Sequence, residues 1–135
     1  MQESKMAEGQ VLVNKIQQHE FSGTHVLAEF YGVTIPLFDQ HEIETVVNKA
    51  CLKGHAHVIK QEAATFANGG YTLFALLKES HLSIHTYPEH HAIFIDVFTC
   101  GKADSKKVVE ELATYYQPIS LTLKTVKRGI KDDEE

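Results

Sequence analysis

The segment at residues 78–102, KESHLSIHTYPEHHAIFIDVFTCGK, combines side chains that can do chemistry. It holds a Glu-Ser pair, four histidines and one of the two cysteines of the chain within 25 positions. Hydroxyl, thiol and imidazole groups act as nucleophiles and proton carriers in enzymes. A buried hairpin with incidental polar residues contains the same types, so both interpretations stay open at this point.

The order of apolar and polar residues in this segment predicts a β-hairpin. Strands are expected over 81–87 and 92–99, joined by a turn at 88–91. If Tyr87 opposes Ala92, alternation gives one face an aliphatic set: Leu82, Ile84, Ile93, Ile95 and Val97. The other face receives a polar and aromatic set: His81, Ser83, His85, Tyr87, Phe94, Asp96, Phe98 and Cys100. A slip of one residue would mix the two sets, so the pattern supports this register.

The predicted register brings reactive groups together. Cys100 lies beside the junction of Glu79 and Ser80, and His85 shares its face of the sheet. We therefore expect a thiol, an imidazole and a hydroxyl to converge near one end of the hairpin. This convergence marks a candidate active site, but it does not choose a reaction.

The rest of the chain predicts two helices and four more strands. Apolar residues recur at helical spacing from Ile43 to Cys51, between an expected capping box at Asp39 and Glu42 and a terminal Gly54. Cys51 lies on the apolar face of this helix, where a buried core thiol is expected. The other predicted elements are strands at 24–32, 55–62, 71–77 and 120–126 and a helix at 105–116.

The element order β-α-β-β-β-β-α-β indicates the α+β class. We expect a two-layer sandwich, a mostly antiparallel sheet with both helices packed on one face, which leaves the other face for a partner or ligand. The whole chain, 1–135, is predicted to be a single domain, with 1–20 as an extension and 129–135 as a solvated acidic tail.

Composition excludes several classes of protein. The chain has 135 residues, 43% of them hydrophobic and 23% charged, which is typical of a soluble globular domain. A net charge of −5 gives no general case for binding nucleic acid. No apolar run approaches the ~18 residues of a membrane span, and the N-terminal segment lacks the apolar stretch of a secretion signal. With only two cysteines, we expect reduced thiols and a cytoplasmic location.

With the hairpin in place, the chain resembles the pyruvoyl-dependent S-adenosylmethionine decarboxylases of bacteria and archaea. The resemblance rests on ESHLSIHTYPE at 79–89 followed by DVFTCG at 96–101, and on GTHVLAEFYG at 23–32. It extends over about residues 23–128. It implies a lyase of polyamine and spermidine biosynthesis that converts S-adenosylmethionine to its decarboxylated form and CO2.

The resemblance implies a proenzyme that cuts itself between Glu79 and Ser80, into a β chain of residues 1–79 and an α chain of residues 80–135. The Ser80 hydroxyl would attack the preceding carbonyl carbon, and elimination from the resulting ester would leave a pyruvoyl group at position 80. That group would form a Schiff base with the substrate amine and accept electrons as CO2 leaves. No metal and no pyridoxal phosphate would then be required.

Further residues receive roles from the family pattern alone. His85 would assist processing, with Thr72 and His81 in support, and Cys100 would return a proton to the α-carbon of the product. Phe66 would stack on the adenine of the substrate, an amino-acid-type small molecule, which Glu89 would help to hold.

The resemblance also implies an assembly. Two processed αβ protomers would pair as a homodimer, with the active sites at or near their interface. Neither nucleic acid nor a membrane is an expected partner.

The segment upstream of the predicted cleavage point departs from the family pattern. The family has Phe-His-x-Phe-x-Pro-x-Gly-Val-Ser-Gly, whereas this chain retains only Phe66 and Gly70, has Ala63 and Ala64 in place of the first pair, lacks the proline and has Thr72 for the serine. Because this loop shapes the substrate pocket, L-ornithine or L-arginine is the alternative substrate. A non-catalytic regulatory homologue is the second alternative.

Two other site chemistries find less support in the hairpin. His81 and His85 share a face near Cys100, but without a second cysteine or a compact His-x-His pair we expect no metal site. A serine hydrolase is not expected either, because no strand-turn-helix elbow surrounds Ser80.

Overall fold

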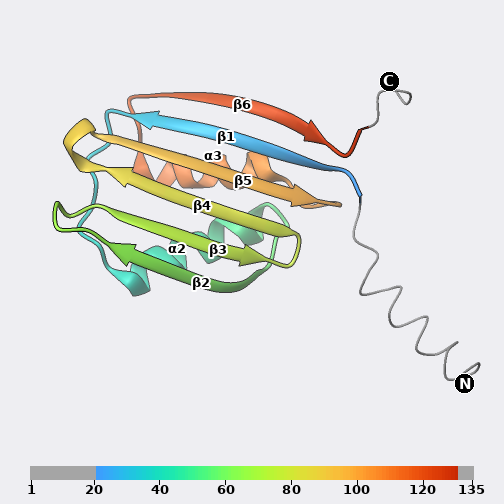
Figure 1. Ribbon diagram of the computed structural model, residues 1–135, viewed down its shortest axis with the longest axis horizontal. Helices are drawn as coiled ribbons and strands as arrows, with labels where there is room; N and C mark the ends of the chain where they lie inside the picture. The colour runs from blue at the N-terminus through green and yellow to red at the C-terminus, as the bar shows by residue number, and fades with distance from the viewer. Residues whose placement is uncertain (1–20, 131–135) are drawn as a thin grey trace, which may run out of the picture.

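The computed structural model describes residues 21–130 and consists of one six-stranded sheet with two helices (Figure 1). In chain order the elements are β1 (Gly23–Tyr31), α2 (Gln40–Lys53), β2 (Val58–Thr65), β3 (Tyr71–Leu77), β4 (Ser80–Tyr87), the 3-10 turn η1 (Pro88–His90), β5 (Ala92–Cys100), α3 (Ser105–Tyr116) and β6 (Ser120–Arg128). The extension predicted at 1–20 and residues 131–135 of the predicted tail lie outside the described residues.

The sheet is antiparallel throughout, with the strand order β2-β3-β4-β5-β1-β6. Both helices lie behind the same face of this sheet, and the other face is open (Figure 1). The predicted α+β two-layer sandwich is therefore confirmed. Within residues 21–130 no helix is long and apolar enough to cross a membrane.

The core lies between the sheet and the helices and follows from the alternation of each strand. The helix-facing positions of the strands are almost wholly buried: Val26, Ala28, Phe30, Leu73, Ala75, Leu82, Ile84, Ile93, Ile95 and Val97. The helices add their apolar stripes: Ile43, Val47, Ala50, Cys51, Val108, Val109 and Leu112. Cys51 is fully buried, as predicted, and burial raises the pKa of its thiol to about 12, so it stays protonated.

The hairpin of β4 and β5 has the predicted register. Tyr87 pairs with Ala92, His85 with Phe94, and Ser80 with Thr99. The aliphatic set faces the helices and the polar and aromatic set lies on the open face. Purely local alternation thus fixes which side chains of residues 80–100 are free to meet a ligand or a partner.

The helix ends match the capping signals in part. Asp39 caps α2 by accepting a hydrogen bond from the backbone N–H of Glu42 at 3.0 Å, and Gly54 ends the helix. The reciprocal half of the capping box is replaced, because Oε2 of Glu42 accepts from the Tyr115 hydroxyl of α3 at 2.6 Å. Glu42 thereby ties the two helices together.

Strand β2 is the one element whose bounds differ clearly from the prediction. A strand was expected over 55–62, but β2 begins at Val58 and ends at Thr65. His55 has a φ of 61° and the N–H of Ala56 binds the Cys51 carbonyl at 2.8 Å, so these residues complete the helix end. At the other end, pairing of Thr65 with Tyr71 extends the strand beyond its predicted end at residue 62.

Candidate active site

The turn between β3 and β4 holds the predicted scissile bond. Leu77 pairs with Ser80, so Lys78 and Glu79 form the tip of a tight hairpin. The carbonyl oxygen of Glu79 accepts a hydrogen bond from the backbone N–H of Cys100 at 3.2 Å. Because this N–H points at the carbonyl that Ser80 would attack, it is placed to stabilise the negative charge that develops on that oxygen.

The backbone at Ser80 is strained. Its φ is 153°, in a region that glycine adopts readily and other residues rarely do. Such a conformation costs on the order of 1–3 kcal/mol and persists only where neighbouring contacts hold it. Cleavage of the bond before Ser80 would release this strain, so the unusual conformation favours the broken chain.

Cys100 ends β5 directly beside this turn. Only 9% of its surface is exposed, and Gly23 at the start of β1 packs against it. A Cβ atom at Gly23 would lie 2.6 Å from the Thr99 carbonyl oxygen and 3.1 Å from Sγ of Cys100. The glycine is therefore needed for the close approach of β1 to the thiol. Cys100 thus lies beside the Glu79–Ser80 junction, as the register predicted.

Glu79 has a side-chain partner that the sequence does not indicate. Its Oε1 accepts from the backbone N–H of His57 at 3.0 Å, and its Oε2 lies 2.9 Å from Nδ1 of the same residue. Burial alone would raise the pKa of Glu79, but the hydrogen bonds from His57 outweigh it and lower the pKa below its usual value. The carboxylate is therefore ionised at neutral pH.

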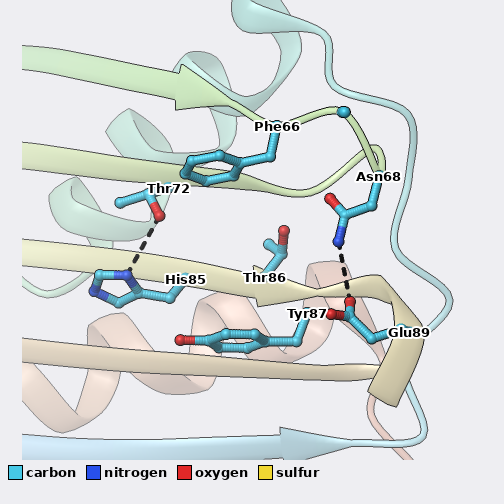
Figure 2. A pocket seen from close by; sticks show the side chains of 8 residues that line it. Phe66, Asn68, Thr72, His85, Thr86, Tyr87 and Glu89 are labelled. Carbon is cyan, nitrogen blue, oxygen red and sulfur yellow. Dashed lines mark hydrogen bonds between the residues drawn. The ribbon is translucent and has the colours of Figure 1, made fainter.

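Four other predicted site residues gather toward the opposite end of β4. Phe66, Thr72, His85 and Glu89 line one cavity of about 480 Å³, together with Asn68 and neighbouring residues (Figure 2). The Thr72 hydroxyl lies 3.4 Å from Nδ1 of His85, and Nδ2 of Asn68 donates to Oε1 of Glu89 at 3.2 Å. Figure 2 shows the Phe66 ring on one side of this cavity and the Tyr87 ring on the other.

The expected convergence of His85 with Ser80 and Cys100 is wrong within one chain. His85 is five positions along β4 from Ser80, which at about 3.3 Å per residue is roughly 16 Å. Sharing a face of the sheet therefore does not bring the imidazole to the thiol. Within residues 21–130, the predicted residues form two separate groups, a cleavage end and a pocket end.

A hydrogen-bonded network lies on the open face between the two ends. Oδ2 of Asp96 lies 2.6 Å from Nε2 of His25 and 3.1 Å from Nε2 of His81, and its Oδ1 accepts from the Ser83 hydroxyl. Burial would raise the pKa of Asp96, but the hydrogen bonds from Ser83, His25 and His81 together lower it. His81 therefore has a fixed orientation next to Ser80. The sequence did not indicate the His25–Asp96 contact, because 71 positions separate the pair.

His25, His81 and Asp96 also have the residue types of a metal site, with ligand atoms within 4.8 Å of one another. Arg128 argues for a hydrogen-bonded network instead. Its guanidinium lies 3.4 Å from Nδ1 of His25 and, being always a donor, makes that nitrogen the acceptor. If the ring is neutral, its proton is then on Nε2 and is donated to Asp96.

Comparisons with known proteins agree with this layout. Residues 24–129 match the family model described as S-adenosylmethionine decarboxylase. An S-adenosylmethionine decarboxylase proenzyme of Picrophilus torridus is 34% identical over 115 residues, covering 82% of this chain and 88% of the relative. One from Methanococcus maripaludis is 36% identical over 115 residues, covering 84% and 94%.

A solved structure matches as well. The crystal structure of the adenosylmethionine decarboxylase from Aquifex aeolicus superimposes with a TM-score of 0.73 at 32% sequence identity, covering 86% of this chain and 98% of that one. The two-layer fold is therefore the fold of that enzyme, and the resemblance read from the hairpin motifs is confirmed.

Proposed function

The chain belongs to the S-adenosylmethionine decarboxylase family of pyruvoyl-dependent decarboxylases, and we propose that it cleaves itself at Glu79–Ser80 and then decarboxylates S-adenosylmethionine. One observation carries the proposal: the carbonyl oxygen before the strained Ser80 accepts a hydrogen bond from the Cys100 backbone at 3.2 Å. The residues at this turn thus fit the formation of a pyruvoyl group from Ser80. The enzyme would act in polyamine biosynthesis in the cytoplasm.

Self-cleavage needs only groups of the chain and one water molecule. The Ser80 hydroxyl attacks the Glu79 carbonyl carbon, the Cys100 N–H stabilises the resulting oxyanion, and the amide C–N bond breaks to give an ester and a free amine. Loss of the α-proton of residue 80 then breaks the Cβ–Oγ bond and releases Glu79 as a carboxylate. The dehydroalanine left behind takes up water and loses ammonia, which leaves the pyruvoyl group.

The remaining residues act around that group. Once formed, the pyruvoyl carbonyl supplies the electron-accepting chemistry for loss of CO2. Cys100 follows Thr99, the partner of Ser80 in β5, and its thiol would return a proton to the α-carbon of the product. His85 and Thr72, joined by their 3.4 Å contact, would move protons during cleavage.

The separation of the two groups of residues supports a site shared between two protomers. The open sheet face carries large apolar side chains that are well exposed, among them Phe74 at 45% and Leu27 and Phe94 at 40%. Exposed apolar patches of this kind mark interfaces. If two open faces pack about a two-fold axis perpendicular to the strands, the pocket end of one protomer lies over the cleavage end of the other. Each site would then draw Ser80 and Cys100 from one chain and His85 from its partner.

The cavity supports S-adenosylmethionine over a smaller amino acid. Phe66 and Tyr87 present aromatic faces suited to stacking on an adenine ring, while Glu89 offers a carboxylate to the hydroxyl or cationic groups of the substrate (Figure 2). A volume of about 480 Å³ falls in the range of pockets that hold nucleoside-sized ligands.

The substrate is tested by measuring CO2 release from labelled S-adenosylmethionine, L-ornithine and L-arginine with the processed protein. We expect turnover of S-adenosylmethionine alone, and a Phe66→Ala variant should raise KM for it. Release of CO2 only from ornithine or arginine would overturn the substrate while leaving the pyruvoyl chemistry intact. A cleaved protein that decarboxylates none of the three would favour the non-catalytic alternative.

A further inference from the structure

His57 holds Glu79, the residue whose carbonyl belongs to the predicted scissile bond, through both its backbone and its side chain. We propose that His57 is a positioning residue for self-cleavage, which fixes Glu79 so that the strained Glu79–Ser80 bond stays in its reactive geometry. This inference rests on the self-cleavage proposed above. It assigns a role to a residue that lies in neither the cleavage motif nor the substrate pocket.

Three hydrogen bonds join His57 to the turn. Its N–H donates to Oε1 of Glu79 at 3.0 Å, its Nδ1 meets Oε2 of Glu79 at 2.9 Å, and its carbonyl oxygen accepts from the N–H of Lys78 at 2.9 Å. Since an ionised carboxylate only accepts hydrogen bonds, Nδ1 of His57 carries the proton in its contact with Oε2. The two oxygens of Glu79 thus each receive one donor from the same residue.

These contacts complete the restraint on the strained bond. On one side of it, pairing of β4 with β3 and β5 fixes Ser80. On the other side, the Cys100 N–H holds the Glu79 carbonyl and His57 holds the Glu79 side chain. A backbone at φ 153° relaxes unless its surroundings over-determine it, and loss of the His57 imidazole would remove one of the three hydrogen bonds that hold Glu79.

The burial of the pair shows which partner depends on the contact. The Glu79 side chain is 18% exposed, whereas His57 is 61% exposed. The carboxylate is mostly buried and its lowered pKa keeps it charged, so it needs its donors. His57 has solvent as an alternative partner, so the carboxylate of Glu79 depends on the contact more than the imidazole does.

The test compares the rate of cleavage at 79/80 in freshly synthesised precursors. His57→Leu removes the Nδ1 donor but keeps the backbone N–H, and we expect cleavage about tenfold slower, the change typical of losing a hydrogen bond to a charged group. His57→Asn places an amide N–H near the position of Nδ1, and we expect it to restore the rate to within about twofold. His41→Ala, an exposed histidine at the start of α2, serves as the matched control and should cleave like the wild type.

Two further measurements separate positioning from general stability. In the uncleavable Ser80→Ala background, His57→Leu should remain folded at the temperature of the cleavage assay, as its Tm will show, so that slow cleavage does not reflect unfolding. In a cycle with Glu79→Ala, the double variant should cleave no more slowly than Glu79→Ala alone, because both changes break one contact. If the His57→Leu chain cleaves at the wild-type rate, His57 has no such role. The same follows if the rate losses of the two single variants multiply fully in the double variant. A wild-type chain that stays whole would instead contradict self-cleavage itself, and with it the role of His57.

Discussion

The backbone N–H of Cys100 lies 3.2 Å from the carbonyl oxygen of Glu79, the atom on which negative charge would develop during self-cleavage. This relationship divides Cys100 into two functional parts. In the proposed mechanism its backbone serves cleavage, and its thiol, 9% exposed beside Gly23, serves the decarboxylation that follows.

Cys100→Ser should separate the two parts. The backbone N–H survives this change, so we expect cleavage at 79/80 at close to the wild-type rate. Turnover should fall by about 10²–10⁴-fold, the usual contribution of a positioned proton donor. Timed gels measure the first step and CO2 release measures the second. Equal loss in both steps would contradict the division, and full turnover would remove the thiol from the mechanism.

A shared site predicts rescue between two defective chains. Ser80→Ala has no nucleophile but keeps His85, whereas His85→Ala keeps the nucleophile. Because each site would take His85 from the partner, co-expressing the two variants should restore cleavage of the His85→Ala chain, which stays whole when expressed alone. Differently tagged chains allow each to be followed on one gel.

The control for this rescue is a double variant. A Ser80→Ala/His85→Ala chain forms the same pairs but supplies no imidazole, so it should give no rescue. If His85→Ala cleaves normally alone, or is never rescued although mixed dimers form, the shared site is wrong.

Asp96 should make the stability of the fold depend on acid. Hydrogen bonds from Ser83, His25 and His81 outweigh burial and lower the pKa of this carboxyl from its ordinary value of 3.8. A carboxyl with a lowered pKa stabilises the folded state above its unfolded pKa and loses this contribution as the pH falls through the folded one. Asp96→Asn, in the Ser80→Ala background, should therefore lower the free energy of unfolding by about 1–3 kcal/mol at pH 7.

The difference in the free energy of unfolding between the Ser80→Ala protein with and without Asp96→Asn should narrow as the pH falls below about 4. Urea unfolding at pH 7 and near pH 3 measures it, and Asp104→Asn, at an exposed helix cap, controls for loss of an ordinary carboxylate. A gap that stays constant over this range would show that the charge of Asp96 does not stabilise the network.

The hairpin at 80–100 was predictable because its information is local. Aliphatic residues on one parity and polar or aromatic residues on the other leave one register, and Tyr87 opposite Ala92 follows from the turn length. The helix at 105–116 and strand at 71–77 were predicted to the residue for the same reason. At β2 the local signal failed, because the backbone of His55 turns left-handed to finish the helix.

The site was less predictable because it depends on distance along strands and on contacts between remote residues. Side-chain parity put His85 and Cys100 on one face but says nothing of the roughly 16 Å between positions 80 and 85. His57 and Glu79 are 22 positions apart and His25 and Asp96 are 71 apart, so no local periodicity links them. Those contacts follow only from the strand order β2-β3-β4-β5-β1-β6.

The central claim, self-cleavage at Glu79–Ser80, is tested most directly by the intact mass of the purified protein under denaturing conditions. The account predicts two fragments, residues 1–79 and 80–135, with the second lighter than its serine form by one ammonia and blocked at its N-terminus. Ser80→Ala should give one chain of full mass. A wild-type protein that remains a single chain after prolonged incubation, or a Ser80→Ala chain that splits at the same bond, would contradict the account.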